Sequence, residues 1–341
     1  MQPIAISVGE PSGIGPDLIV SCYADRKKLQ LAPFFVLADP VMLAGRAERL
    51  GIRVEIANLD SPQHAAATFA NALPVIPLHN THLDSPGELK SENAAGTVEA
   101  IERATAFVLG GEASALVTAP IDKKALYDAG FNHPGHTEFL AELCARSSGR
   151  QIQPVMLLTG PELSCVPVTI HIPLSEVVGA LTTELIVETA QIVVRHLQMD
   201  FGLEKPVLAV AGLNPHAGER GALGMEDISV IVPAVQKLQG MGIDATGPLP
   251  ADTMFHAEAR STYDVALCMY HDQALIPVKT LGFDQAVNVT LGLPIIRTSP
   301  DHGTAMGLAA SGRARPDSFI AAIDLAARMA QSRHNFRTHT Q

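Results

Sequence analysis

Short apolar runs alternate with longer amphipathic stretches along this chain, and that alternation limits the possible folds more than any other feature. The runs with the composition of buried strands are IAISV, FFVLA, ALVTA, VMLLT, CVPVTI, PVLAVAG, DVALCMY and LPIIRT. Helical periodicity is found at residues 93–109, 183–199, 229–239 and 318–329. Strands that alternate with helices predict an α/β fold with mostly parallel sheets, and continuously apolar strands predict sheets covered on both faces.

The chain has 341 residues, a length that corresponds to two domains of ordinary size or to one large domain. No flexible linker divides it, so two domains would require the chain to pass between them more than once. The tail SRHNFRTHTQ is polar, and we expect it to fray.

Charge and composition exclude several classes of partner. The formal net charge is −11 and there is no basic run, which argues against nucleic acid because binding to phosphate backbones needs concentrated Lys and Arg. No apolar stretch is long enough to predict a membrane span. The N-terminal MQPIAISVGE lacks the features of a signal peptide, so we expect a cytoplasmic protein. The cysteines are far apart and are expected to be reduced, buried thiols.

The loop VGEPSGIGPD follows the first apolar run. Glycine-rich loops in this position often bind phosphates, but Gly9, Gly13 and Gly15 have neither the Rossmann nor the P-loop spacing. The residues predict a strand that turns sharply into a helix, with Pro16 at the first helical position and Asp17 in the first turn. A nucleotide role for the loop stays open on this pattern alone.

Three histidines follow predicted strands: His171 after CVPVTI, His216 after PVLAVAGLNP and His271 after DVALCMY. Ligands of open α/β sheets bind at the carboxyl ends of strands, and three protein ligands with an open position are typical of a catalytic metal site. Each histidine could instead be a hydrogen-bonded loop residue. Asp252 and Asp272 could orient the ligands or accept a proton, or they could be helix N-caps or turn residues.

A second set of polar residues could bind an anionic substrate. His136 and Thr137 precede an amphipathic helix, whose first backbone N–H groups favour an anion; Thr137 could also be its N-cap. Lys279, Asn288 and Arg297 follow the third histidine in one segment. Local cations are needed because the net charge of the chain repels anions. Arg297, near the end of LPIIRT, is the stronger candidate, and Lys279 could be a surface residue.

Several longer motifs occur in one order over nearly the whole chain: GEPSGIGPD, GHTE, TIHIPL, GLNPHAGE, GPLPADT, MYHDQ and NVTLGLPIIRTSPDHGTA. Together they resemble the 4-hydroxythreonine-4-phosphate dehydrogenase family of pyridoxine biosynthesis; GLNPHAGE and MYHDQ are the specific ones. The opening loop also resembles the GDGIGPE turn of isopropylmalate and isocitrate dehydrogenases, and DHGTAMGLAASGRARP resembles their cofactor loop.

This resemblance implies an isopropylmalate-dehydrogenase-like fold with two α/β/α domains flanking a central cleft. A discontinuous cofactor-side domain would comprise residues 1–125 and 290–341, and a metal-binding and dimerisation domain would comprise residues 126–289. The implied reaction is oxidation of 4-phosphooxy-L-threonine by NAD+ with decarboxylation to 3-amino-2-oxopropyl phosphate, on the route to pyridoxine 5′-phosphate. The family works as a homodimer with its active site near the subunit interface, so we expect a homodimer.

The resemblance also implies residue roles. The metal ligands would be His171, His216 and His271, holding Zn2+ or else Mg2+ or Co2+. The substrate-binding residues would be His136, Thr137, Lys279, Asn288 and Arg297. The candidates for the base are Asp252, Asp272 and Lys279. The cofactor-binding residues would be Gly13, Gly15, Asp301, His302, Gly303 and Thr304.

Other functions remain possible on the sequence. A related dehydrogenase could act on 4-phosphoerythronate, phosphothreonate or an aromatic cis-dihydrodiol, although GHTE and the Lys279, Asn288 and Arg297 set favour phosphooxythreonine. A binding protein without catalysis would be expected to have lost a metal or substrate residue, and none is lost. An acyltransferase of the phosphotransacetylase type has a distantly similar fold but would not need three histidines.

Overall fold

The structure, a computed structural model, describes residues 2–128, 130–131, 133 and 135–340, the last without its side chain. The chain forms two compact units, each built from two separate segments. Unit 1 comprises Met1–Pro154 and Leu293–Gln331, and unit 2 comprises Val155–Gly292 and Ser332–Gln341. Residues 126–154 therefore belong to unit 1, whereas the sequence-based division assigned them to the second domain.

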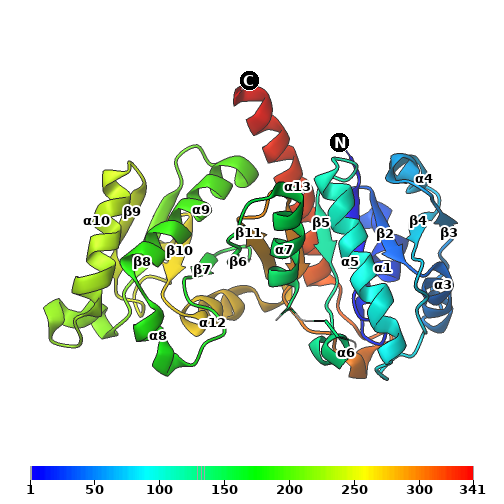
Figure 1. The fold of residues 1–341 in the computed structure, drawn as a ribbon, viewed down its shortest axis with the longest axis horizontal. Coiled ribbons are helices and arrows are strands. Elements are labelled where there is room, and N and C mark those ends of the chain that lie inside the picture. Colours follow the sequence, from blue (N-terminus) through cyan, green and yellow to red (C-terminus); the bar gives the residue numbers. More distant parts are fainter. Residues whose placement is uncertain (1, 129, 132, 134, 341) are drawn as a thin grey trace. The chain divides into compact units, whose positions relative to one another are not determined.

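Unit 1 contains a parallel sheet with the strand order β3-β4-β2-β1-β5-β12. Its strands are β1 (Ile4–Ser7), β2 (Phe34–Ala38), β3 (Ile56–Asn58), β4 (Leu73–Pro77), β5 (Leu116–Thr118) and β12 (Arg297–Pro300). Its helices include α1 (Gly15–Ala24), α2 (Arg26–Leu29), α3 (Pro40–Arg49), α4 (Ala65–Thr68), α5 (Ala94–Leu109), α6 (Lys123–Asp128) and α7 (His136–Ser148). Helix α5 packs on β1, β2 and β5 (Figure 1). Strands β1, β2 and β5 are buried along their whole length, as their apolar sequences predict, and β12 is also buried although its sequence is RTSP.

Unit 2 contains a mixed sheet with the strand order β11-β6-β7-β10-β8-β9. Its strands are β6 (Val155–Thr159), β7 (Ser164–Pro167), β8 (Val207–Ala211), β9 (Asp244–Leu249), β10 (Val265–Cys268) and β11 (Val287–Leu291). Strand β6 is antiparallel to β7 and β11, and the pairs from β7 to β9 are parallel. Its helices include α8 (Leu174–Ala180), α9 (Thr183–Phe201), α10 (Val232–Gly240), α11 (Ala257–Arg260) and α12 (His271–Gly282). The expected α/β class with mostly parallel strands is confirmed.

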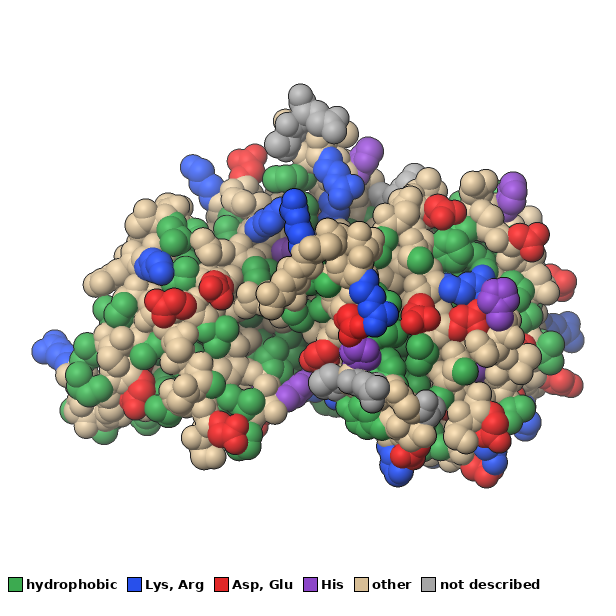
Figure 2. Space-filling view, in the orientation of Figure 1, with side chains coloured by type: hydrophobic (Ala, Val, Ile, Leu, Met, Phe, Trp, Pro, Cys, Tyr) green, Lys and Arg blue, Asp and Glu red, His purple; other side chains and the backbone are tan. Residues whose placement is uncertain are grey.

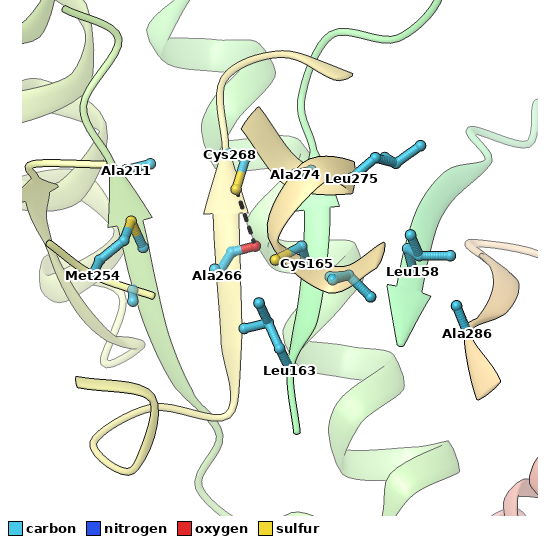
Figure 3. Packing of buried hydrophobic residues seen from close by; sticks show 12 residues of the cluster. Leu158, Leu163, Cys165, Ala211, Met254, Ala266, Cys268, Ala274, Leu275 and Ala286 are labelled. Atoms are coloured by element: carbon cyan, nitrogen blue, oxygen red, sulfur yellow. Dashed lines mark hydrogen bonds between the residues drawn. The ribbon is translucent and has the colours of Figure 1, made fainter. Parts of the chain in front are cut away.

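A buried cluster in unit 2 fixes the position of α12. Its members are Leu158, Leu163, Cys165, Ala209, Ala211, Met254, Ala266, Cys268, Ala274, Leu275, Val278 and Ala286. Figure 3 shows Ala274 and Leu275 of α12 beside Cys165 and Cys268 of the two central strands. Because α12 buries this face, its first residues, His271 and Asp272, are held at the end of β10.

The predicted helices are present, with one correction at the C-terminus. The periodic stretches correspond to α5, α9, α10 and α13 (Asp317–Thr340), and α10 is preceded by a π-helical turn at Asp227–Ile231. The tail does not fray as expected, because α13 continues to Thr340. Near the start of the tail, Arg333 is buried, and its guanidinium donates to both carboxylate oxygens of Asp200 at 2.5 and 2.7 Å.

The strand expected at LPIIRT begins later than the apolar run. Strand β12 starts at Arg297, after a bend that includes Pro294, which has no N–H to donate to a neighbouring strand. The preceding strand β11, with the sequence VNVTL, was not among the predicted runs.

Charged side chains of both signs lie on the visible surface. On the face drawn in Figure 2, Lys and Arg side chains are interspersed with Asp and Glu. Within the described part of the chain, no single helix has the length and apolarity needed to cross a bilayer. Helices α8 and α9 reach that length and apolarity only when taken together, and they are bent by 92° relative to each other. All four cysteines are buried and free.

Candidate active-site residues

The loop between β1 and α1 is the strand-to-helix turn that the sequence predicts, and it leaves no room for side chains at its glycines. Gly9 has φ +75°, and a Cβ atom there would lie 2.5 Å from the Pro120 carbonyl oxygen. A Cβ atom at Gly13 would lie 2.6 Å from the Thr304 carbonyl oxygen. The same oxygen accepts a hydrogen bond of 2.9 Å from the Ile14 N–H. The structure therefore brings together Gly13 and Thr304, two of the predicted cofactor residues.

Arg46 of α3 holds this loop, and sequence reasoning missed it. Its side chain is fully buried, with 0% exposure. The guanidinium donates to the carbonyl oxygens of Gly13 at 2.9 Å and Pro11 at 2.7 Å. The carboxylates of Asp17 and Asp84 balance its charge. Nothing in the sequence distinguishes Arg46 from a solvent-exposed arginine on an amphipathic helix.

The ion pair of Arg46 and Asp17 also contacts the segment that follows the predicted cofactor residues. The second carboxylate oxygen of Asp17 accepts a hydrogen bond of 2.7 Å from the Ala310 N–H. Burial raises the pKa of Asp17, and the hydrogen bond and charge of Arg46 oppose that rise. Asp17 thus joins the opening loop to residues 304–310.

Three other predicted cofactor residues, Asp301, His302 and Gly303, lie between β12 and this contact, and Gly15 begins α1. The Asp301 N–H donates to the Ser318 hydroxyl at 3.1 Å. His302 Nδ1 lies 3.0 Å from the Gly303 carbonyl oxygen, and its Nε2 is buried with no partner among the described residues. Since a buried polar atom without a partner is unfavourable, the segment fits a ligand that would supply one.

Three of the predicted substrate residues come together in unit 1. His136 and Thr137 begin α7, and Arg297 begins β12. Arg297 is only 4% exposed and donates from Nε and Nη2 to the Thr118 hydroxyl at 3.2 and 2.7 Å. Thr137 is not the N-cap, because Gly135 occupies that position and provides no side-chain cap. The first-turn amides of α7 are consequently not capped by a side chain.

Electrostatics keep His136 uncharged. Burial is the largest cause that lowers its pKa well below the ordinary value, and the positive charges of Arg297 and Lys123 lower it further. Its Nε2 is buried and has no partner among the described residues. Burial lowers the pKa of Arg297 to about 10, although the Glu138 carboxylate acts in the opposite direction. Arg297 therefore stays cationic at neutral pH beside a neutral imidazole.

The predicted metal ligands all lie in unit 2, and the structure pairs two of them. His171 follows β7 and His271 begins α12; their ring centroids are 5.5 Å apart. His271 Nδ1 lies 2.7 Å from the Asp272 carboxylate, which leaves Nε2 as the nitrogen for a ligand role. Within the described ranges, no three His, Cys, Asp or Glu side chains are grouped to hold a metal ion, so His216 is not in one set with this pair.

His216 follows β8 in a turn of unusual backbone. Residues 216–220 all have positive φ, from +42° to +75°, and only Gly218 is a glycine. Each non-glycine residue in this region is disfavoured by about 1–2 kcal/mol. His171 also has a positive φ, +52°. Such strain tends to be retained at functional positions.

Cavities surround the start of α12. One of about 440 Å³ is lined by Asp252, Asp272, Phe255 and Ile276, among others. A second, of about 220 Å³, is lined by His171, His271 and Asp272. A third, of about 460 Å³, adds Lys279 and Phe283 to His271 and Asp272. Asp272 lines all three cavities, which connects the candidate base residues with the histidine pair.

The last candidate, Asn288, is on β11, where its register partner is Leu158 of β6. It does not line any of these three cavities. Asp252 lies in the turn after β9 and is not a helix N-cap.

Comparisons with known proteins agree with one another. Residues 30–326 match the family model described as pyridoxal phosphate biosynthetic protein PdxA. The chain is 52% identical over 340 residues to a 4-hydroxythreonine-4-phosphate dehydrogenase of Bradyrhizobium diazoefficiens, covering 97% of this chain and 98% of that protein. The crystal structure of 4-hydroxythreonine-4-phosphate dehydrogenase from Klebsiella pneumoniae is similar with a TM-score of 0.85 and 37% identity, covering 97% and 100% of the two chains. A terephthalate 1,2-cis-dihydrodiol dehydrogenase from Burkholderia xenovorans LB400 is more distant, with a TM-score of 0.65 and 26% identity over 96% and 98%.

Proposed function

Because this chain belongs to the PdxA family of pyridoxal phosphate biosynthetic proteins, we propose that it is an NAD-dependent, divalent-metal-dependent 4-hydroxythreonine-4-phosphate dehydrogenase. Its substrate would be 4-phosphooxy-L-threonine, and its product 3-amino-2-oxopropyl phosphate for pyridoxine 5′-phosphate synthesis. The observation that carries the proposal is the 52% identity to a dehydrogenase of that name over nearly the full length of both chains.

The chemistry requires a hydride acceptor and a base. The hydride leaves the substrate's secondary alcohol carbon for NAD+, and the hydroxyl proton passes to a protein group. The resulting β-keto acid then loses its carboxylate as CO2. We propose Asp252 as the base, because it shares a cavity with Asp272 while Asp272 is already bonded to His271. Asp272 would then orient His271, and Lys279 remains a second candidate for the base.

We propose that a divalent cation, Zn2+ or else Mg2+ or Co2+, is held by His171, His271 and His216. The close rings of His171 and His271 and the Asp272 contact to His271 Nδ1 support two of these ligands. The His216 turn would have to contribute the third from outside that pair. When bound, such a cation supplies Lewis acidity that favours loss of the alcohol proton and stabilises the negative charge left after decarboxylation.

The other roles follow the two groups of candidate residues. We propose that His136, Thr137 and Arg297 bind an anionic group of the substrate, with Lys279 and Asn288 as further substrate contacts. Gly13, Gly15 and the segment Asp301–Thr304 would bind NAD+; the contact of Gly13 with Thr304 and the unpartnered Nε2 of His302 support this assignment.

We also propose a cytoplasmic homodimer whose active site lies near the subunit interface. Support comes from large apolar side chains that are exposed on α8 and α12 and just after α12. Leu174 is 68% exposed, Val178 53%, Ile276 62% and Phe283 66%. Exposed apolar groups of this size often mark protein–protein contacts.

The test is an NADH-formation assay on the purified full-length chain. We expect NADH and CO2 from 4-phosphooxy-L-threonine, loss of activity after treatment with EDTA, and recovery on adding Zn2+. Full activity after complete metal removal would reject the metal role.

The alternative is a changed substrate on the same fold, and the similarity to the dihydrodiol dehydrogenase is its specific support. Parallel assays with 4-phosphoerythronate, phosphothreonate and an aromatic cis-dihydrodiol discriminate between them. A kcat/KM for any of these above that for 4-phosphooxy-L-threonine would replace the proposed substrate.

A further inference from the structure

We propose that Arg46 is a positioning residue for the dinucleotide cofactor, and that it acts by holding residues 84–88 as a support against the opening loop and the segment that begins at Thr304. The identity of the cofactor rests on the proposed function. The contacts that carry the inference all lie in unit 1. Residues 84–88 belong to no motif, and none of them is among the residues that the sequence predicts for the site.

Residues 84–88 contact both predicted parts of the cofactor site. The Gly87 N–H donates to the Ser12 carbonyl oxygen at 2.8 Å. Gly87 has φ +82°, and a Cβ atom there would lie 3.5 Å from the Met306 carbonyl oxygen. Gly87 therefore lies against the opening loop and also against the backbone just after Thr304.

The Ser12 side chain connects the opening loop to this segment a second time. Its hydroxyl donates to the Glu88 carbonyl oxygen at 2.7 Å and lies 3.3 Å from the Ser85 hydroxyl. Ser85 also donates to the Glu88 carbonyl oxygen, at 2.9 Å. The two hydroxyl groups thus fix the turn that carries Gly87.

The Arg46 guanidinium bonds to all sides of this arrangement. Its Nε and Nη2 donate to one carboxylate oxygen of Asp84 at 3.0 and 2.8 Å. Its Nη1 and Nη2 also donate to two carbonyl oxygens of the opening loop at 2.9 and 2.7 Å. Asp17, which pairs with Nη1, accepts from the Ala310 N–H through its other oxygen. One side chain therefore links the opening loop, residue 84 and, through one carboxylate, residue 310.

These bonds suit an arginine and a positioning role. A guanidinium offers several N–H donors in a rigid plane, whereas a lysine has one donor nitrogen and could not reach acceptors on several sides at once. Arg46 is fully buried, and two carboxylates balance its charge. It is therefore placed to hold the segments together and not to bind the cofactor's phosphates itself.

Loss of this support should act on the cofactor selectively. Misplacing a binding group by about 1 Å can reduce a rate by about 100-fold. Without the bonds of Arg46, residues 84–88 can shift, and Ser12 and Met306 lose their common contact at Gly87. Affinity for 4-phosphooxy-L-threonine should be retained, because none of the described partners of Arg46 is a predicted substrate residue.

Two other arginines of unit 1 provide matched controls. Arg49 is one turn further along α3 and bonds to the other oxygen of Asp84 at 2.7 Å, but its side chain is 56% exposed. Arg26 resembles Arg46 in donating to three carbonyl oxygens, one in α1 and two at residues 69–70, all outside the predicted cofactor segments. Arg26→Lys therefore reports the effect of losing such bonds on stability alone.

Gly87 has a control of its own. Gly111 also has a positive φ, +74°, so alanine introduces comparable backbone strain at both positions. A Cβ atom at residue 111 would have nothing within 4 Å. A difference between Gly87→Ala and Gly111→Ala therefore isolates the contacts of Gly87 with Ser12 and Met306.

The experiment uses the full-length chain, after circular dichroism has shown that each variant is folded. Fluorescence titration measures the Kd of NADH, and thermal unfolding measures Tm. Steady-state assays measure kcat and the separate KM values for NAD+ and 4-phosphooxy-L-threonine. The wild type is compared with Arg46→Lys, Arg49→Lys, Arg26→Lys, Gly87→Ala and Gly111→Ala.

We expect Arg46→Lys and Gly87→Ala to raise the NADH Kd and the KM for NAD+ by about tenfold or more, with the KM for 4-phosphooxy-L-threonine changed by less than about twofold. The three control variants should bind NADH like the wild type, even where Arg26→Lys lowers Tm. If Arg46→Lys does not fold, Asp84→Asn takes its place; it weakens the bonds to Arg46 by removing a charge, and should raise the same two constants by about threefold or more.

The inference is overturned if the folded Arg46 variant, or Asp84→Asn in its place, binds NADH like the wild type. It is also overturned if Arg49→Lys or Arg26→Lys weakens NADH binding equally, if both KM values rise together, or if the wild type does not bind NADH. Equal effects of Gly87→Ala and Gly111→Ala would reject the role of residues 84–88.

The proposed function is tested separately by the same measurements. NADH binding that depends on Arg46, without NADH formation from 4-phosphooxy-L-threonine, rejects the proposed activity and retains the positioning role. NADH formation by the wild type that Arg46→Lys matches in every constant rejects the positioning role and retains the activity.

Discussion

His82 is a buried residue of unit 1 whose ring nitrogens both lack partners among the described residues. The side chain is 5% exposed, and its backbone N–H donates to the Asp39 carboxylate at 3.0 Å. Burial lowers the pKa of His82 to about 4, and the negative charges of Asp39 and Glu99 offset only part of that effect. The folded protein thus holds this imidazole neutral at a pH where an exposed histidine is already protonated.

This pKa predicts a loss of stability in mild acid. An unfolded histidine titrates near pH 6.5, so below that pH the unfolded state binds a proton that the folded state excludes. The free energy of unfolding should fall as the pH decreases from about 6.5 to about 4, by up to about 3 kcal/mol from this residue. Urea unfolding at a series of pH values measures it, with His82→Leu expected to flatten the slope. The exposed His64→Gln is the control, and an unchanged slope in His82→Leu would contradict the prediction.

Among the elements, the contact between the opening loop and residues 304–310 depends on backbone packing that no side chain can replace. Gly13 touches the Thr304 carbonyl, while Arg46 and Asp17 hold the two sides of the contact. A methyl group at residue 13 meets backbone, which cannot rotate away as a flexible side chain could. If this contact is lost, the opening loop and the predicted cofactor segment should therefore move apart.

Gly13→Ala should raise the KM for NAD+ by about tenfold or more, because small displacements of binding groups are costly to catalysis. The same change should reduce the free energy of unfolding by about 1–3 kcal/mol through overpacking. Gly307→Ala is the matched control, since a Cβ atom there would have nothing within 4 Å and the residue is not among the predicted cofactor residues. Steady-state kinetics with varied NAD+ and thermal unfolding provide the measurements. Equal effects of the two substitutions would show that this contact does not position the cofactor segment.

The elements also show what the sequence could predict. Periodicity located α5, α9 and the first half of α13, because each has a continuous apolar face. Periodicity failed at the C-terminal tail, where Arg333 of the helix bonds to the buried carboxylate of Asp200. Composition identifies Arg333 and Arg46 only as charged residues. Their burial depends on contacts with residues distant in the sequence, and no local sequence pattern predicts those contacts.

For the whole molecule, motif order was the most informative signal, since it led to the family that the comparisons confirm. The site was predictable only in part. His171 and His271 come together because parallel strands β7 and β10 are neighbours. His216 follows β8, which is also a neighbour of β10. The left-handed backbone of its turn sets the direction of the chain there, and strand order does not predict that direction.

The proposed homodimer gives a prediction at this scale. Ile276→Glu places a charge on the exposed apolar surface that continues to Phe283, and should shift the chain from dimer to monomer by desolvation and charge repulsion. Light scattering coupled to size-exclusion chromatography measures the mass, and the NADH assay should show a parallel loss of activity. Val41→Glu is the control, because Val41 is 78% exposed but lies in unit 1. A monomeric wild type would refute the dimer.

The ion pair between Arg333 and Asp200 has a practical consequence for anyone who edits the end of this chain. His196 adds to it, since its Nδ1 lies 2.7 Å from Asp200 and its Nε2 accepts a 2.9 Å hydrogen bond from the Gly292 N–H. A truncation that removes residue 333 would leave the buried Asp200 carboxylate without its arginine partner. This carboxylate lies near the segment where the chain leaves unit 2. Truncated versions and C-terminal fusions should therefore keep that arginine, however dispensable the polar tail looks on paper.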